Sequence, residues 1–115
     1  MADERGFSTR AIHTAHFHGA GKGQSIAFPI FQTAGFAFAS AEEHESVASG
    51  AEPGFAYSRI GNPTTDALHQ TIASLEGGAA AGSFASGIGA IAAAMLAVVD
   101  SGQHVLATER VYGGT

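Results

Sequence analysis

The last third of the chain carries the pattern that most restricts its fold. An apolar stretch at 82–85, a helical stretch up to about Val99 and a second apolar stretch at 104–108 follow one another with short links. The helical stretch repeats large apolar residues every three or four positions, at Ile88, Ile91, Met95 and Val99. Two strands joined by one helix lie parallel, with a right-handed crossover. We therefore expect the start of an α/β fold, whose parallel sheet needs more strands than these two and helices on both faces.

A second helix is predicted just before this unit. Asn62 is a good helix N-cap, and Pro63 suits the first helical position because its missing N–H costs nothing there. Gly77 and Gly78 mark its end. Its apolar residues Leu68, Ile72 and Leu75 recur on one face.

The first 55 residues lack sustained periodicity and are rich in Gly and Phe. Pro29 argues against a central strand among them. One short helix is expected to start at Ser40, where the following glutamates suit a positive helix N-terminus. We interpret residues 1–55 as an arm of irregular and short extended pieces, whose Phe side chains need another surface to cover them.

Composition narrows the function classes. Only 13% of the residues are charged, against about 25% in typical globular chains, which favours a surface covered by further chain or by partner subunits. The net charge is −5, and the five basic residues form no run, so neither nucleic acid nor a membrane surface is an expected partner. No apolar run reaches the roughly 20 residues of a membrane span. Cysteine is absent, which excludes disulfides and fits a cytoplasmic protein.

Two places could bind an anion. If the chain is extended at Tyr57-Ser-Arg59, both side chains point to the same side and form a clamp of phenol and guanidinium; the alternative is an ordinary surface pair. At Ser86-Gly87-Ile88-Gly89 the expected helix start offers backbone N–H groups and the positive end of the helix dipole. The alternative there is a tight turn that holds nothing.

The helix start also admits a rival interpretation. Gly87-x-Gly89-x-x-Ala92 matches a dinucleotide-binding fingerprint, and Glu109 ends the next expected strand, where a ribose-binding acid belongs. A nucleotide (NAD-type) binding βαβ domain therefore stays open at this point. It leaves the stretch from Tyr57 to Thr64 unexplained.

Other motifs are set aside. The segment from Gly19 to Ser25 fails the phosphate-loop pattern, because its lysine, Lys22, is followed by Gly, and it is interpreted as a flexible loop. His13, His16 and His18 have no carboxylate at ligand spacing, so no metal site is expected.

Five segments together carry a family resemblance. They are Pro29-Ile-Phe-Gln-Thr33, Tyr57-Ser-Arg59-x-x-Asn62-Pro63-Thr64, Leu75-Glu-Gly-Gly78, Ala85-Ser86-Gly87 and Val111-Tyr112-Gly-Gly-Thr115. In this order they resemble the Cys/Met-metabolism enzymes that depend on pyridoxal 5'-phosphate (PLP): cystathionine γ-synthases, cystathionine and methionine γ-lyases, and O-acetylhomoserine sulfhydrylases. The resemblance implies a fold type I transferase, usually a homotetramer built as a dimer of dimers.

The resemblance also implies a role for each matching residue. Tyr57 and Arg59 match the pair that binds the PLP phosphate of a neighbouring subunit. Ser86, Gly87 and Ile88 match the turn whose main chain holds the phosphate in the same subunit. Tyr112 matches the ring that stacks on the cofactor and takes part in proton transfer. Residues 1–60 would then be an N-terminal arm reaching the neighbour's site, and 61–115 the start of the large PLP-binding domain.

Several features depart from the family pattern. Ile88 replaces a Met of many members, with little consequence expected for a main-chain contact. The Schiff-base lysine is missing, since Lys22 lacks its sequence context, and so is the aspartate that pairs with the pyridine nitrogen; PLP chemistry needs both. Gly114 stands where methionine γ-lyases often carry Cys.

We therefore expect the N-terminal portion of an enzyme for γ-replacement or γ-elimination on homoserine esters, cystathionine or methionine. The chain alone is expected to be inactive. The alternative is a truncated docking subunit with no catalysis of its own.

Overall fold

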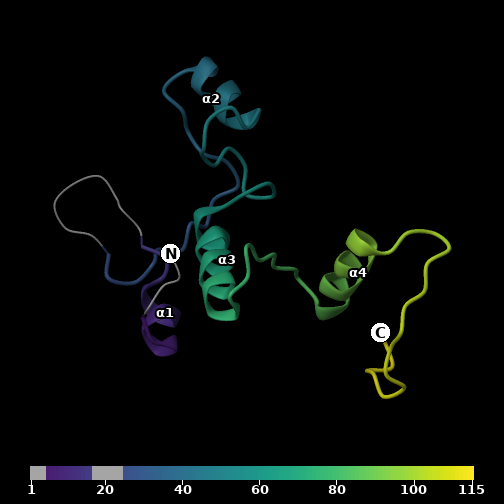
Figure 1. Ribbon diagram of the computed structural model, residues 1–115. Coiled ribbons are helices and arrows are strands. Elements are labelled where there is room, and N and C mark those ends of the chain that lie inside the picture. The colour runs from purple at the N-terminus through teal and green to yellow at the C-terminus, as the bar shows by residue number, and fades with distance from the viewer. Residues whose placement is uncertain (1–4, 17–24) are drawn as a thin grey trace. The chain divides into compact units, whose positions relative to one another are not determined.

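The computed structural model describes residues 5–16 and 25–115, which form two compact units, one up to Ala81 and one from Gly82 to Thr115. The helices are α1 (Phe7–His13), α2 (Ala41–Ala48) and α3 (Pro63–Glu76) in the first unit, and α4 (Gly87–Val98) in the second (Figure 1).

Helix α3 confirms the boundaries expected from its end signals. The Asn62 side chain accepts a hydrogen bond from the Thr64 N–H, and Pro63 occupies the first turn. Gly77 ends the helix in the left-handed region at φ 68°, where a residue with a Cβ would be strained.

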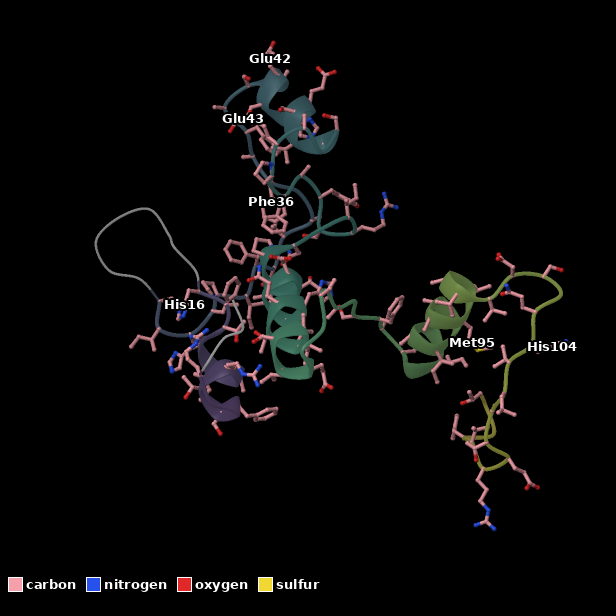
Figure 2. The ribbon with its side chains drawn as sticks, in the orientation of Figure 1. His16, Phe36, Glu42, Glu43, Met95 and His104 are labelled. Atoms are coloured by element: carbon pink, nitrogen blue, oxygen red, sulfur yellow. The ribbon has the colours of Figure 1, made fainter. Side chains whose placement is uncertain are left out.

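Helix α2 confirms the short helix expected after Ser40. The Ser40 hydroxyl accepts from the Glu43 N–H, and the Glu43 carboxylate accepts from the Ala39 N–H, so these two side chains each satisfy one N–H group at the helix start. Figure 2 shows Glu42 and Glu43 on this helix. Hydrogen bonds from its own backbone N–H and from the Ser40 side chain lower the pKa of Glu42, as expected for a carboxylate at a helix N-terminus.

Helix α1 corrects the interpretation of the arm as irregular throughout. It packs against α3, and the Arg10 guanidinium donates a hydrogen bond to the Ser74 carbonyl near the α3 C-terminus. A seven-residue helix is too short to show a periodic pattern and too short to be stable alone. The contact with α3 stabilises it, and a sequence pattern does not reveal that contact.

The arm meets the segment before α3 through one isolated antiparallel bridge, between Gly35 and Tyr57. The Phe36 N–H donates to the Ala56 carbonyl at 3.2 Å, and the Ser58 N–H donates to the Ala34 carbonyl at 2.8 Å. These bonds hold the end of the arm beside the residues that the sequence marks as an anion clamp.

The second unit contains the expected helix but not the expected strands. α4 runs from Gly87 to Val98, close to the predicted end at Val99. The stretches 82–85 and 104–108 form no ladder, and across 5–16 and 25–115 the Gly35–Tyr57 bridge is the sole β-pairing. A strand exists only when a neighbouring backbone pairs with it, and parallel strands need further strands that this chain does not supply.

Little of the chain is buried. Among the described residues, only Ala67 and Asn62 are less than one-tenth exposed, and large apolar side chains such as Leu96 are open to solvent. No helix in the described ranges is long and apolar enough to cross a bilayer. The glycine-rich segment 19–24, with Lys22, and His18 lie outside the described residues.

The small core generates a prediction. On its own, the 115-residue chain should unfold without a cooperative transition, because so little apolar surface leaves water. Differential scanning calorimetry should show no sharp endotherm, and the chain should bind a hydrophobic dye. A reversible two-state transition with an enthalpy of about 60–80 kcal/mol, normal for a domain of this size, would contradict this prediction.

Candidate functional site

The pair Tyr57–Arg59 is brought together by a turn and not by the extended conformation that the sequence analysis considered. The Ile60 and Gly61 N–H groups both donate to the Tyr57 carbonyl, at 2.9 and 3.0 Å. The Arg59 guanidinium carbon lies 5.2 Å from the Tyr57 ring centroid, a cation–π distance. Both side chains are exposed, so the phenol and guanidinium donors are accessible from solvent.

The turn is tied to the rest of the first unit by its middle residue. The Ser58 hydroxyl donates to the Thr33 carbonyl of the arm and accepts a hydrogen bond from the Asn62 side chain at 2.8 Å. The candidate anion clamp is therefore anchored on one side to the arm and on the other to the start of α3.

The start of α4 has the geometry of an anion site. The Ser86 hydroxyl oxygen accepts from the Gly89 N–H at 3.1 Å, which caps the helix. The first intrahelical bond runs from the Ala90 N–H to the Ser86 carbonyl, so the N–H groups of Gly87 and Ile88 have no intrahelical acceptor and lie at the positive end of the helix dipole. The Ser86 hydroxyl hydrogen is a third donor at the same end.

The two glycines of this turn differ in the space around them. A Cβ on Gly87 would meet no heavy atom within 4 Å, whereas a Cβ on Gly89 would come within 3.0 Å of the Ser86 hydroxyl oxygen. Gly89 is thus constrained by the cap itself. The local fold does not require a glycine at Gly87, which leaves an open approach to the backbone there.

Tyr112 lies in the turn at the end of the second unit. The Thr115 N–H donates to its carbonyl at 2.8 Å, and the side chain is 85% exposed. A Cβ on Gly114 would approach the Tyr112 ring to 2.7 Å, so a glycine there lets the ring lie over the turn. The ring face is open for stacking.

An apolar hollow of about 450 Å³ in the first unit is separate from these candidates. The Phe36 ring, labelled in Figure 2, forms part of its wall. The Phe55 ring lies 6.0 Å from it and lines the same hollow. None of the six candidate residues lines it. The hollow gathers the arm's Phe side chains, which the sequence analysis expected to need a covering surface; its aromatic lining is Phe28, Phe31, Phe36, Phe38 and Phe55.

Two other hypotheses can be compared with the geometry. Within 5–16 and 25–115 no three His, Asp or Glu side chains cluster at metal-binding range. For the dinucleotide hypothesis, Gly87 and Gly89 do lie at a helix start, but Glu109 does not end a strand.

The comparisons with known proteins identify the chain. The sequence profile of the Cys/Met metabolism PLP-dependent enzyme family matches residues 8–115. The chain is 43% identical over 110 residues to an L-methionine gamma-lyase of Porphyromonas gingivalis, covering 96% of this chain and 27% of that protein. It is 41% identical to an O-acetyl-L-homoserine sulfhydrylase of Corynebacterium glutamicum, covering 99% of this chain and 26% of that one.

A solved structure agrees. An O-acetylhomoserine (thiol)-lyase of Campylobacter jejuni, crystallised with N'-pyridoxyl-lysine-5'-monophosphate, superposes with a TM-score of 0.83 at 33% identity, covering 96% of this chain and 27% of that one. The protein belongs to the Cys/Met metabolism PLP-dependent enzyme family. The chain spans about a quarter of the length of these relatives.

The residues present fit a PLP phosphate. Tyr57 and Arg59 supply a phenol and a guanidinium in one turn, and the open space at Gly87 leaves the α4 N–H groups accessible. The family membership and this fit replace the dinucleotide hypothesis, which gave Tyr57 and Arg59 no role. The lysine that PLP chemistry needs is not among these residues, since Lys22 is the single lysine of the chain.

Sequence reasoning missed several residues that shape the site. It treated Asn62 as a helix cap and gave no contact to Ser58 or Thr64, although all three lie inside the family motif. It also missed Arg10, whose bond to the Ser74 carbonyl joins α1 to α3. The roles of these residues are identified by their hydrogen-bond partners in the folded structure, which the sequence does not reveal.

The Ser86 cap can be tested directly. Ser86→Ala removes the acceptor of the Gly89 N–H and should speed hydrogen exchange at that amide about fivefold, equivalent to the roughly 1 kcal/mol of a typical N-cap. Amide exchange followed by NMR measures this. Ser101→Ala, outside the helix, should leave the Gly89 rate unchanged. Equal rates in the two variants would show that Ser86 does not cap α4.

Proposed function

We propose that this chain is the N-terminal quarter of a PLP-dependent enzyme of sulfur amino-acid metabolism that catalyses γ-replacement or γ-elimination. The observation that carries the proposal is the Tyr57–Arg59 turn, a paired phenol and guanidinium within a chain that matches the family over residues 8–115. The substrates would be activated homoserine esters, cystathionine or methionine, the classes named by the relatives and by the family resemblance.

The chain's own residues bind the cofactor phosphate in this proposal. Arg59 neutralises part of the phosphate charge with a fixed fork of donors, and Tyr57 adds a hydroxyl donor. In a second subunit, the N–H groups of Gly87 and Ile88 and the Ser86 hydroxyl donate to the same phosphate, with the α4 dipole oriented favourably. Donors from two subunits would make the assembled oligomer the binding unit, in a dimer of dimers.

Tyr112 takes the remaining role assigned to this chain. Its exposed ring would stack on the cofactor ring, and its phenol would hold or move a proton close to the reacting atoms. When bound, PLP supplies the electron sink that the reaction needs. The catalytic lysine and the aspartate beside the pyridine nitrogen would come from the part of the enzyme beyond Thr115.

The domain division follows from these roles. Residues 1–60 would be an arm that reaches the neighbouring subunit's site, and 61–115 the start of the large PLP-binding domain. The protein would work in the cytoplasm on small amino-acid substrates. The relatives named methionine gamma-lyase and O-acetylhomoserine sulfhydrylase are nearly equal in identity, at 43% and 41%, so the identities do not select one reaction.

The proposal is tested first by the gene. Reading the genome in frame beyond Thr115 should reveal roughly three-quarters of a family-length protein, with a lysine in the family's Ser-x-Thr-Lys context. A stop codon directly after Thr115 would contradict the proposal and favour a docking subunit without catalysis.

The phosphate clamp is tested in the complete enzyme. Arg59→Gln should weaken PLP binding about 10- to 100-fold, because a hydrogen bond to a charged group is lost, and Tyr57→Phe should weaken it less, by about fivefold. Titration of the apoenzyme with PLP, followed by cofactor absorbance, gives both constants. Arg5→Gln is the matched control, since Arg5 donates to the His13 carbonyl, away from the clamp. Equal affinities for the Arg59 and Arg5 variants would remove the clamp from the mechanism.

A further inference from the structure

Asn62 is the one polar residue that is buried among those the structure describes, with 7% of its surface exposed. A buried amide destabilises a fold unless its hydrogen bonds are satisfied. Its carbonyl oxygen accepts from the Thr64 N–H at 2.9 Å, and its Nδ2 donates to the Phe31 carbonyl at 2.9 Å and to the Ser58 hydroxyl oxygen at 2.8 Å. Both amide hydrogens are used, so the side chain has one satisfied orientation.

Thr64 makes the second half of the same connection. Its hydroxyl accepts from the Phe31 N–H at 2.8 Å and donates to the Pro29 carbonyl at 3.1 Å. Together with Asn62, it pairs the N–H and the carbonyl of Phe31. The arm backbone from Pro29 to Phe31 is therefore held by side chains at the start of α3. In a β-strand the same backbone groups would pair with the backbone of a neighbouring strand.

Ser58 links this connection to the clamp. It lies between Tyr57 and Arg59 in the turn, accepts from Asn62, donates through its hydroxyl to the Thr33 carbonyl and donates through its N–H to the Ala34 carbonyl. A displacement of Asn62 would therefore break or shift a hydrogen bond to Ser58, the residue between the two clamp side chains.

We infer that Asn62 and Thr64 are positioning residues that fix the Tyr57–Arg59 turn to arm segment 29–34, so that the phosphate clamp and this part of the arm behave as one body. The inference rests on the proposed function, in which the Tyr57–Arg59 turn binds the PLP phosphate. Capping α3 requires only the Asn62 carbonyl oxygen. The two Nδ2 bonds and the Thr64 hydroxyl bonds do not serve the cap and have the arm and the turn as partners.

A consequence distinguishes this role from general stability. Because coupling between two sites is reciprocal, phosphate binding at the clamp should slow hydrogen exchange at the arm amides, including Phe31. A clamp held in place before binding also loses less conformational entropy when it binds. Cofactor affinity and arm protection should then fall together when the connection is cut.

The experiment uses the complete PLP-loaded enzyme. Asn62→Ser keeps a good N-cap oxygen without added charge but removes both amide donors. We expect PLP affinity to fall on the order of tenfold and the PLP-dependent protection of segment 29–34 to disappear. Gln70→Ser is the matched control, because it deletes an exposed amide of the same helix that donates a hydrogen bond to Asp66 rather than to the arm or the turn. It should change neither quantity.

A double-mutant cycle with Arg59→Gln separates positioning from stability. If Asn62 acts through the clamp, Asn62→Ser should cost little further PLP affinity once Arg59→Gln is present. Fully additive losses would overturn the inference. If PLP affinity falls in Arg59→Gln but not in Asn62→Ser, the inference is overturned and the proposed function stands. If PLP affinity does not fall in Arg59→Gln, the proposed function itself is overturned.

Thr64 supplies an independent pair of variants if Asn62→Ser fails to fold. Thr64→Val keeps the side-chain shape and removes both hydroxyl bonds, and Thr64→Ser retains the hydroxyl. PLP affinity and arm protection should fall in Thr64→Val and recover in Thr64→Ser. Equal behaviour of the two variants would contradict the positioning role.

Discussion

The side-chain amide of Asn62 joins three parts of the first unit that are far apart in sequence. One oxygen caps α3, and two hydrogens reach the arm at Phe31 and the turn at Ser58. Among the described residues Ala67 is the only apolar one that is buried, so little apolar packing supports the geometry around Asn62. Burial strengthens these bonds and makes their loss costly, because an unpaired amide in that position cannot be solvated.

The two candidate phosphate-binding groups obtain their donors in different ways. Tyr57 and Arg59 provide side-chain donors from a turn anchored at both ends, while α4 provides backbone donors from a helix start that Ser86 caps. A guanidinium carries full charge, and a helix terminus carries only partial charge, so the two contributions complement each other around a dianion. They belong to separate units of the chain, which suits a site that different subunits complete in the proposed enzyme.

The exposed apolar residues have a consistent explanation in this scheme. The five Phe side chains around the hollow of the first unit and the apolar α4 form surfaces that a larger parallel sheet and neighbouring subunits would cover. The chain spans about a quarter of its relatives, so most of the surfaces that would bury these residues belong to the remaining three-quarters. A β-ladder at 82–85 or 104–108 would likewise need neighbouring strands.

The sequence by itself determined the helices whose signals are local: Ser40 and Asn62 as caps, Pro63 at a first turn and Gly77 at an end. It also determined the family, because each of the five motifs is a short continuous segment that can be recognised without the structure. Tertiary structure alone decided α1, which depends on contact with α3, and the turn that pairs Tyr57 with Arg59. It also decided the connection through Asn62 and Thr64 to the arm, because hydrogen bonds between residues some 30 positions apart leave no periodicity in a sequence.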